Sequence, residues 1–369
     1  MVTHKPEDLD YMDHVIFMAE GGHLVFQGNA KKYLDYFETT NTIEVYVQLV
    51  TPNSSRWIDN FNTGEIGPKP KAIPNGGSVT KSRANFIKQY YWLTRRYFNI
   101  KLNDKLNTLI LIGQAPIIAI LIGLIFDKIS PAVTFIMAVS AIWFGTSNAA
   151  REIVSESAIY KRERMFNQGI WPYLFSKITV LTVFSLIQTF LFIGIIAFAF
   201  SGNEIPWNNV GVSFIILSLI SLTSTVFGLF LSSIMSNTEK VMAVVPITLI
   251  PQIMLSGLIA KINVFAVEIL SYFTISRWGN ELLNINQKEL KIETMISDPI
   301  HPDLPAIANE QTVNAGQYIK GQYHEDYQSI FGNWSSTWQL DTFALTSMIL
   351  VLLFFTFILM KRKDPIQIK

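Results

Sequence analysis

Six long apolar segments constrain this chain more than any other feature of its sequence. Each reaches the roughly 20 residues that a helix needs to cross the hydrocarbon core of a bilayer. Lys177 is their only charged residue, and it lies near a segment end from which it can extend to the interface. The sequence therefore predicts an all-α polytopic membrane protein with six transmembrane helices. The predicted spans are about 107–126, 131–150, 172–200, 209–235, 241–260 and 342–360.

Composition agrees with this class and excludes several functions. Half of the 369 residues are hydrophobic and only 15% are charged, which is fewer than in a typical soluble domain. The formal net charge of +1 gives no reason to expect a nucleic-acid partner. The sequence contains no Cys, which excludes disulfides, thiolate metal sites and Cys nucleophiles.

The distribution of basic residues predicts the topology. An even number of spans places both termini on one side, and basic residues gather in 95–105, in the loop that starts at Arg151, and in 361–363. The positive-inside rule assigns that side to the cytoplasm. The long segment 261–340 is then an external loop. It opens with a semi-apolar, helix-like run that is able to dip back toward the membrane, and it continues as a polar section that contains Pro.

The N-terminal segment 1–38 has a different character. Two short β runs, Val15–Met18 and His23–Phe26, flank a Gly-Gly pair, and Asn29 is placed to cap a following helix. A hairpin and one helix cannot bury a core alone. We therefore expect this segment to be the C-terminal edge of a larger domain that is missing or supplied by another chain, with Met1 an artificial start.

Two connecting segments follow. Residues 39–83 are rich in Pro, Gly, Asn, Ser and Thr, which is typical of a linker. Residues 84–105 predict an amphipathic helix, with an apolar face opposite Lys88, Arg95 and Arg96. An aromatic and basic helix of this kind, placed before a membrane span, is suited to the membrane interface. The alternative is an ordinary helix packed on protein.

The spans lack the groups that two classes of membrane protein require. No His lies in a span and no G-x-S-x-G motif occurs, which disfavours an intramembrane zinc enzyme or a serine hydrolase. Proton or sodium coupling requires ionisable groups at membrane depth, and the spans have none there. Energy for any active transport must therefore come from outside the membrane.

The N-terminal segment VTHKPEDLDYMDHVIFMAEGGHLVFQG resembles the end of an ABC ATPase domain of the White/ABCG subfamily. The resemblance implies that His4 is the switch histidine that senses the γ-phosphate of ATP, whereas the alternative is an ordinary surface His. It also implies that the Walker A, signature and Walker B motifs lie upstream of Met1. ATP and Mg²⁺ would then be bound by that missing domain, and this chain alone should not hydrolyse ATP.

The charged stretch between the second and third predicted spans gives a sharper match. Its E-x-x-x-Y-K-R-E pattern resembles the coupling helix of the same subfamily, expected here at about 153–166. The resemblance implies contact with the ATPase through Glu156, Tyr160, Arg162 and Glu163, and it continues to Tyr173 and Lys177. Ser157 departs from the pattern, because relatives often have a basic residue there. A solvated loop that only sets topology is the alternative.

The resemblance also implies a substrate path between two permease halves. The second and fifth spans would face each other across a dimer axis. Their side chains there are largely apolar and aromatic, which suits lipophilic or amphipathic substrates, with lipid-facing packing as the alternative. The residues expected in this cavity are Phe135, Trp143, Phe144, Thr248, Gln252 and Met254.

Together these features predict the permease part of an ATP-driven ABC exporter that works by alternating access. Its partners would be an ABC ATPase domain, a second permease half in a homodimer, and membrane lipid. The sequence of the charged stretch is similar to that of bacterial members, and the external loop has no Cys, which also favours a bacterial source. The resemblance therefore predicts the plasma (inner) membrane. Two alternatives stay open: an ABC-2 permease for glycolipid or polysaccharide export, and a non-transporting receptor or scaffold that binds through 261–340.

Overall fold

The computed structural model describes residues 9, 12–50, 54–63, 85–296, 307–323 and 338–363. The chain divides into two compact units, Met1–Arg83 and Ala84–Lys369. His4, the predicted switch histidine, lies outside the described residues.

The first unit is built on the predicted hairpin. Strands β1 (His14–Ala19) and β2 (His23–Asn29) pair antiparallel, with His14 opposite Asn29 and Ala19 opposite His23. The one-turn 3-10 helix η2 (Glu20–Gly22) joins them, and both of its glycines have positive φ, of 82° and 78°. A side chain would strain both positions, so the Gly-Gly pair sets the turn.

Three helices cover one face of this hairpin. Asn29 accepts a hydrogen bond from the backbone of Lys31 before the short helix α1 (Tyr33–Tyr36), and α2 (Thr42–Val50) and α3 (Ser54–Thr63) follow. Phe37, Val45 and Trp57 are buried against the strands. Within the predicted linker, for which some local order near Trp57 was expected, Thr42–Val50 and Ser54–Thr63 are thus helical. The apolar spacing of Val45 and Leu49 was the missed helix signal.

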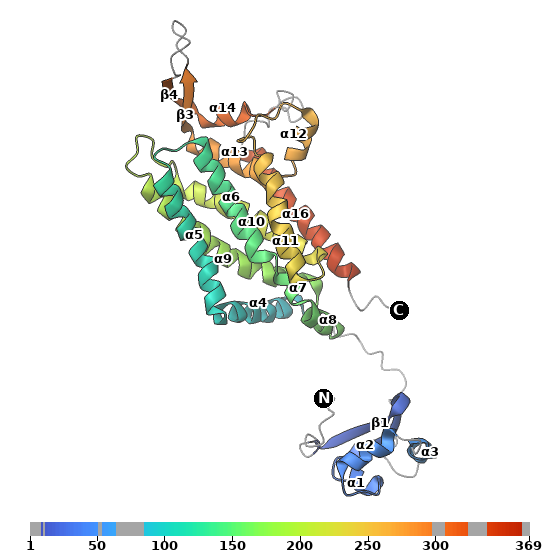
Figure 1. Cartoon of the computed structure of the whole chain (residues 1–369). Helices are drawn as coiled ribbons and strands as arrows, with labels where there is room; N and C mark the ends of the chain where they lie inside the picture. Colours follow the sequence, from blue (N-terminus) through green and yellow to red (C-terminus); the bar gives the residue numbers. More distant parts are fainter. Residues whose placement is uncertain are drawn as a thin grey trace. The chain divides into compact units, whose positions relative to one another are not determined.

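The second unit is a bundle of long apolar helices (Figure 1). Among the described residues, five helical stretches are long and apolar enough to cross a membrane, so the structure supports a multi-pass membrane protein. The predicted fifth span corresponds to α11 (Thr238–Met254), which has 17 residues and two internal prolines and is not among these five. The six-span count is thus not confirmed. The five helices are α5 (Lys105–Ile125), α6 (Pro131–Ala149), α9 (Ile170–Ala199), α10 (Val210–Ile234) and α16 (Trp338–Arg362).

Helix α6 lies at the centre of the bundle and packs most extensively on α10. Its sequence is rich in small residues, and Ala138, Ala141 and Gly145 are buried. Small side chains let two helix backbones approach closely, which is the main route to tight helix packing in a bilayer.

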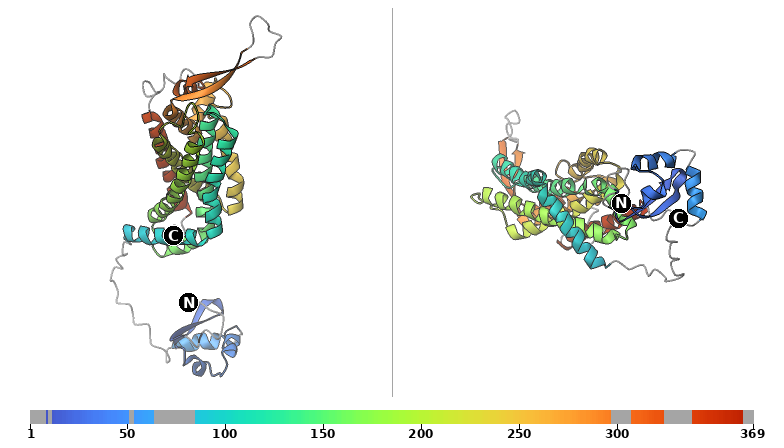
Figure 2. Two further views of the ribbon diagram at one scale, coloured as in Figure 1. Left: turned by 90° about the vertical axis from the view of Figure 1, so that its left-hand side faces the viewer. Right: turned by 90° about the horizontal axis from the view of Figure 1, so that it is seen from below.

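Helix α4 (Phe86–Asn103) and two short helices cover one end of the bundle. Helix α4 lies across the ends of the spans rather than along them (Figures 1 and 2). The predicted coupling helix at 153–166 is divided into α7 (Glu152–Ser155) and α8 (Ser157–Met165), which meet at Glu156. Both lie at the same end of the unit as α4.

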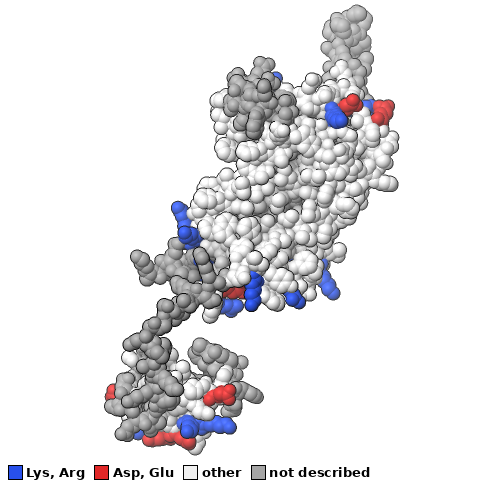
Figure 3. All heavy atoms as spheres, turned by 180° about the vertical axis from the view of Figure 1, so that it is seen from behind, with Lys and Arg blue, Asp and Glu red and all other residues white. Residues whose placement is uncertain are grey.

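The opposite end carries α12 (Phe265–Ser271), α13 (Ile275–Gln287), α14 (Ala315–Lys320) and a projecting hairpin (Figure 1). Strands β3 (Glu289–Ile296) and β4 (Ile307–Asn314) form this antiparallel hairpin, so the prediction of an all-α membrane domain was incomplete. On the face drawn in Figure 3, charged side chains of this unit lie near its two ends and the surface between them is uncharged. An uncharged belt of this kind fits a bilayer.

Candidate functional site

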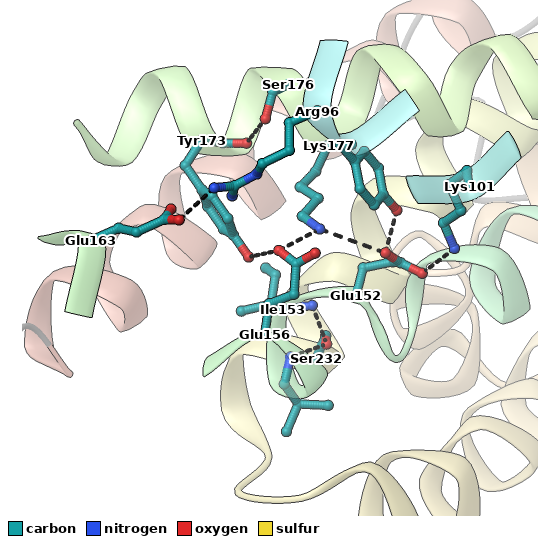
Figure 4. A network of polar contacts seen from close by, with 12 residues as sticks. Arg96, Lys101, Glu152, Ile153, Glu156, Glu163, Tyr173, Ser176, Lys177 and Ser232 are labelled. Carbon is teal, nitrogen blue, oxygen red and sulfur yellow. Dashed lines mark hydrogen bonds and ion pairs between the residues drawn. The ribbon is translucent and has the colours of Figure 1, made fainter. Parts of the chain in front are cut away.

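A cluster of charged side chains joins α4, α7 and the start of α9 at the α4 end of the bundle (Figure 4). Its acids, Glu152 and Glu156, stand at the two ends of α7. One turn of helix places them on the same side, where they point toward α4 and α9.

Lys177 occupies the middle of this cluster. Its ammonium nitrogen is 2.7 Å from Glu156 Oε2 and 3.7 Å from Glu152 Oε2. It also lies 3.6 Å from the centroid of the Tyr97 ring, and the whole residue is only 1% exposed. An ammonium so deeply buried requires compensating charge, and the two carboxylates and the aromatic face supply it.

Glu152 is held from α4 as well. The Tyr97 hydroxyl donates a hydrogen bond to its Oε2, and Lys101 Nζ lies 2.5 Å from its Oε1. Burial raises the pKa of the Tyr97 hydroxyl well above its ordinary value, and the Glu152 charge raises it further. Tyr97 therefore stays protonated and keeps donating over the physiological pH range.

Helix α8 is fastened to α4 through further polar contacts. Arg96 of α4 pairs with Glu163 of α8. Gln89 of α4 bonds to the turn after α8: its side-chain oxygen accepts from Gly169 N at 2.9 Å, and its side-chain nitrogen donates to Asn167 O at 3.0 Å. Tyr160 is buried, and its ring lies 4.8 Å from that of Tyr173. Helix α8 and the turn that follows it are therefore in direct contact with both α4 and α9.

Helix α7 is also bonded to the end of α10. Ser232 Oγ accepts hydrogen bonds from the backbone N–H groups of Ile153 and Val154, both at 3.1 Å (Figure 4). These donors belong to the first turn of α7, which has no acceptor within its own helix for them. Ser232 thus links the start of α7 to the membrane helix α10.

Replacing Ser232 with alanine is expected to leave these two buried donors without an acceptor. A loss of about 1–2 kcal/mol in the stability of the α7–α10 contact should follow. Hydrogen exchange should then quicken at Ile153 and Val154. Ser233→Ala is the matched control, because Ser233 Oγ donates its hydrogen bond to Phe230 O within α10 itself. Equal exchange in the two variants would show that Ser232 does not hold α7.

The structure separates the four predicted coupling residues into two groups. Glu156 and Tyr160 point into the cluster, and Glu156 pairs within the chain rather than being left to pair across an interface. Glu163 is half-buried and pairs with Arg96, whereas Arg162 is exposed. Only Arg162 is thus fully presented to a partner, next to Met165 and Phe166, which are 64% and 83% exposed.

The predicted cavity residues are also divided. Phe144 is fully buried and packs on Phe192 of α9, and Phe135 is buried as well. Gln252 is buried and accepts a hydrogen bond from the Ser276 backbone. Trp143, Thr248 and Met254 are partly or largely accessible on α6 and α11. Within one chain, therefore, these three are the more accessible of the six predicted cavity residues.

Sequence reasoning missed much of the cluster. It named neither Glu152 nor the α4 residues Tyr97 and Lys101, and it did not find Ser232. A charged residue alone in a span is a signal that a buried partner is needed, so Lys177 could have pointed to the acids of the preceding charged stretch, but not to which of them it pairs with. Among the described residues, no group of three or more His, Asp or Glu is arranged to hold a metal ion.

A comparison with known protein families finds a match that includes the charged cluster. The family model described as ABC-2 type transporter matches residues 88–288, which is more than half of the chain and includes all of the cluster. The chain belongs to the ABC-2 type transporter family. The White/ABCG resemblance of the sequence is thereby confirmed at the level of the membrane domain.

Individual proteins similar to this ABC-2 type chain include an ABC transporter and two White proteins. The chain is 22% identical over 303 residues to the ABC transporter ATP-binding/permease protein Rv1747 of Mycobacterium tuberculosis, covering 76% of this chain and 35% of that protein. It is 24% and 25% identical to Protein white of Ceratitis capitata and of Drosophila melanogaster, each over 78% of this chain and 48% of the relative. The chain thus spans about a third to a half of the length of these relatives.

Proposed function

We propose that this ABC-2 type chain is the permease part of an ATP-driven exporter, and that the free surface of α8 docks an ABC ATPase domain. One observation carries the proposal: α8 is tied to α4 and α9 on its inner side and presents Arg162, Met165 and Phe166 uncovered on its outer side. The relative from Mycobacterium tuberculosis, whose name includes both ATP-binding and permease, supports this assignment.

The cluster supplies the path for force. An ATPase domain that moves α8 would also move Glu156 and Tyr160, and hence the start of α9 through Lys177 and Tyr173. The same movement would reach α10 through Ser232. Buried ion pairs and packed rings suit this task because they transmit displacement with little slack. ATP and Mg²⁺ belong to the ATPase domain in this proposal.

The substrate path is proposed between two copies. Helix α11 exposes a face that includes Pro246, Ile247 and Met254, and it has few contacts with the rest of its own bundle. Its two internal prolines leave backbone carbonyls without intrahelical partners and allow bending. With Trp143 of α6, this apolar surface would line a cavity for lipophilic or amphipathic substrates and alternate between two openings. Both termini would be cytoplasmic, in the plasma membrane.

The docking surface can be tested in vesicles that contain the chain and an ABC ATPase domain from the same genome. Arg162→Glu and Phe166→Asp are each expected to lower the ATP hydrolysis that depends on the membrane domain by about tenfold, as for a central interface residue. Export of a lipophilic dye should fall in parallel. Lys105→Glu is the matched charge reversal, at an exposed position outside α8, and should change either rate by less than about twofold.

Two results would contradict the proposal. Wild-type hydrolysis and export in both α8 variants would show that α8 does not receive the ATPase domain. A chain that stays monomeric and recruits no ATPase domain would favour the receptor or scaffold function instead.

A further inference from the structure

A lateral groove runs beside α16 at the end of the bundle that carries α12 and α13. Its walls come from α10, α11, α16 and the α12–α13 arm, and its cavity volume is about 500 Å³. This lies in the range of about 300–1,000 Å³ that is usual for small-molecule sites. Most of its lining residues are aromatic or branched apolar side chains, among them Phe227, Tyr272, Phe273, Trp278, Phe343 and Val351.

The described residues that line the groove carry no charge, and their polar side chains are already engaged. Gln252 Oε1 accepts from Ser276 N at 3.0 Å, and Trp278 Nε1 donates to Tyr272 O at 2.9 Å. Ser347 Oγ donates to Ala344 O at 2.8 Å. The groove therefore offers little to a charged or strongly polar molecule, whose desolvation would go uncompensated. Its electrostatic complement is a neutral hydrocarbon.

The groove has the direction and length of a lipid chain. Its lining on α16 extends from Leu340 to Leu352, which is about 18 Å along a helix at 1.5 Å per residue. One leaflet of a bilayer contributes about 15 Å to a hydrocarbon core of about 30 Å. A groove that follows a spanning helix over this depth matches an extended acyl chain better than a compact molecule.

The mouth of the groove continues onto the surface that faces lipid. Helix α16 is among the most apolar spans, and only 17% of an 18-residue apolar stretch of it is buried. At the mouth, Phe273 and Phe343 are 76% and 63% exposed. Acyl chains can therefore enter sideways from the surrounding bilayer without crossing water or displacing a polar contact.

We propose that this groove is a binding site for one acyl chain of a membrane phospholipid, in the leaflet at the α12–α13 end. The chain lies along α16, against the rings of Trp278 and Phe343. The site is separate from the charged cluster and from the exposed face of α11, and it requires neither ATP nor a second copy. It therefore stands independently of the transport function proposed above.

The test uses the full chain in lipid nanodiscs that contain a phosphatidylethanolamine with a photoactivatable diazirine in one acyl chain. Irradiation should label the α16 peptide that carries Phe343 and the α13 peptide that carries Trp278, above the labelling of the exposed α5 residue Leu109. Ala344→Trp fills the groove and should lower labelling of the α13 peptide by at least about fivefold. Thr346→Trp adds the same ring at an exposed position of α16 outside the groove and should leave it unchanged.

Ser347→Phe serves as a second filling variant if Ala344→Trp does not fold, as judged by gel filtration. Excess unlabelled phospholipid should compete with the probe in the wild-type protein. The proposal is overturned if filling the groove leaves labelling of the α13 peptide unchanged, or if labelling is uniform over the exposed apolar helices. Absence of lipid labelling at Phe343, in a chain that gel filtration shows to be a dimer, would instead make the groove an interface between two copies.

Discussion

Gly145→Ala is expected to be the most damaging single-methyl change in the membrane unit. A Cβ at this position of α6 would lie 2.2 Å from Ser221 O and 2.8 Å from Thr225 N, both backbone atoms of α10. Backbone of a packed helix cannot rotate away as a side chain can, so the two helices would have to separate. The methyl group should cost about 3 kcal/mol, the upper part of the range for overpacked cores.

Thermal unfolding of the purified chain, together with the yield of monodisperse protein, measures this effect. Gly194→Ala is the matched control, because nothing lies within 4 Å of a Cβ added at that position of α9. It should be neutral, or stabilising by up to about 1 kcal/mol through helix propensity. Equal unfolding temperatures for the two variants would mean that α6 and α10 are not in close contact at Gly145.

Gly228 of α10 makes a similarly close approach to α6. A Cβ there would lie 2.7 Å from Thr146 O and 2.9 Å from Ala149 Cβ. Two glycines on facing helices therefore set the separation of α6 and α10 near the end that leads into α7. Because α7 is bonded to α10 through Ser232, this close packing also fixes the position of α7.

Five of the six predicted spans correspond to long apolar helices, because a run of apolar residues identifies a membrane helix without reference to its neighbours. Helix α13 could not be recognised as a core element in this way. Its sequence includes Arg277, Asn280 and Glu281, yet all three are buried. Arg277 lies 4.0 Å from the Tyr323 ring centroid and pairs with Glu268, so its burial depends on groups that only the folded chain assembles.

In the candidate site, too, some residues could be predicted from local sequence and others could not. The spacing of Glu156, Tyr160, Arg162 and Glu163 within one stretch made them visible to pattern reasoning. By contrast, Tyr97 meets Glu152 across 55 residues, and Ser232 meets Ile153 across 79. Such contacts depend on how α4 and α10 pack, which no local pattern of a single sequence specifies. The proposed coupling roles of the four residues remain predictions.

Lys177→Met tests whether the charged cluster acts as one unit. Lys177 is almost fully enclosed, and its removal would leave Glu152 paired with Lys101 and Glu156 without the ammonium that lies beside it. Breaking a buried ion pair on one side typically costs about 3–5 kcal/mol, mostly through the charge left behind. We expect a loss of about 3 kcal/mol in thermal unfolding experiments, whereas Lys105→Met, at an exposed position, should change stability by less than about 0.5 kcal/mol.

A second substitution distinguishes charge from packing. If uncompensated charge causes the loss, Glu156→Gln should restore part of the stability in the Lys177→Met background, although it destabilises the wild-type protein. If Lys177 matters only through the contacts of its aliphatic chain, Met should replace it with little loss and the double variant should show no recovery. Because α4, α7 and α9 meet at this lysine, recovery of stability without recovery of ATP-driven export would place the coupling function in the ion pair itself, beyond its contribution to the fold.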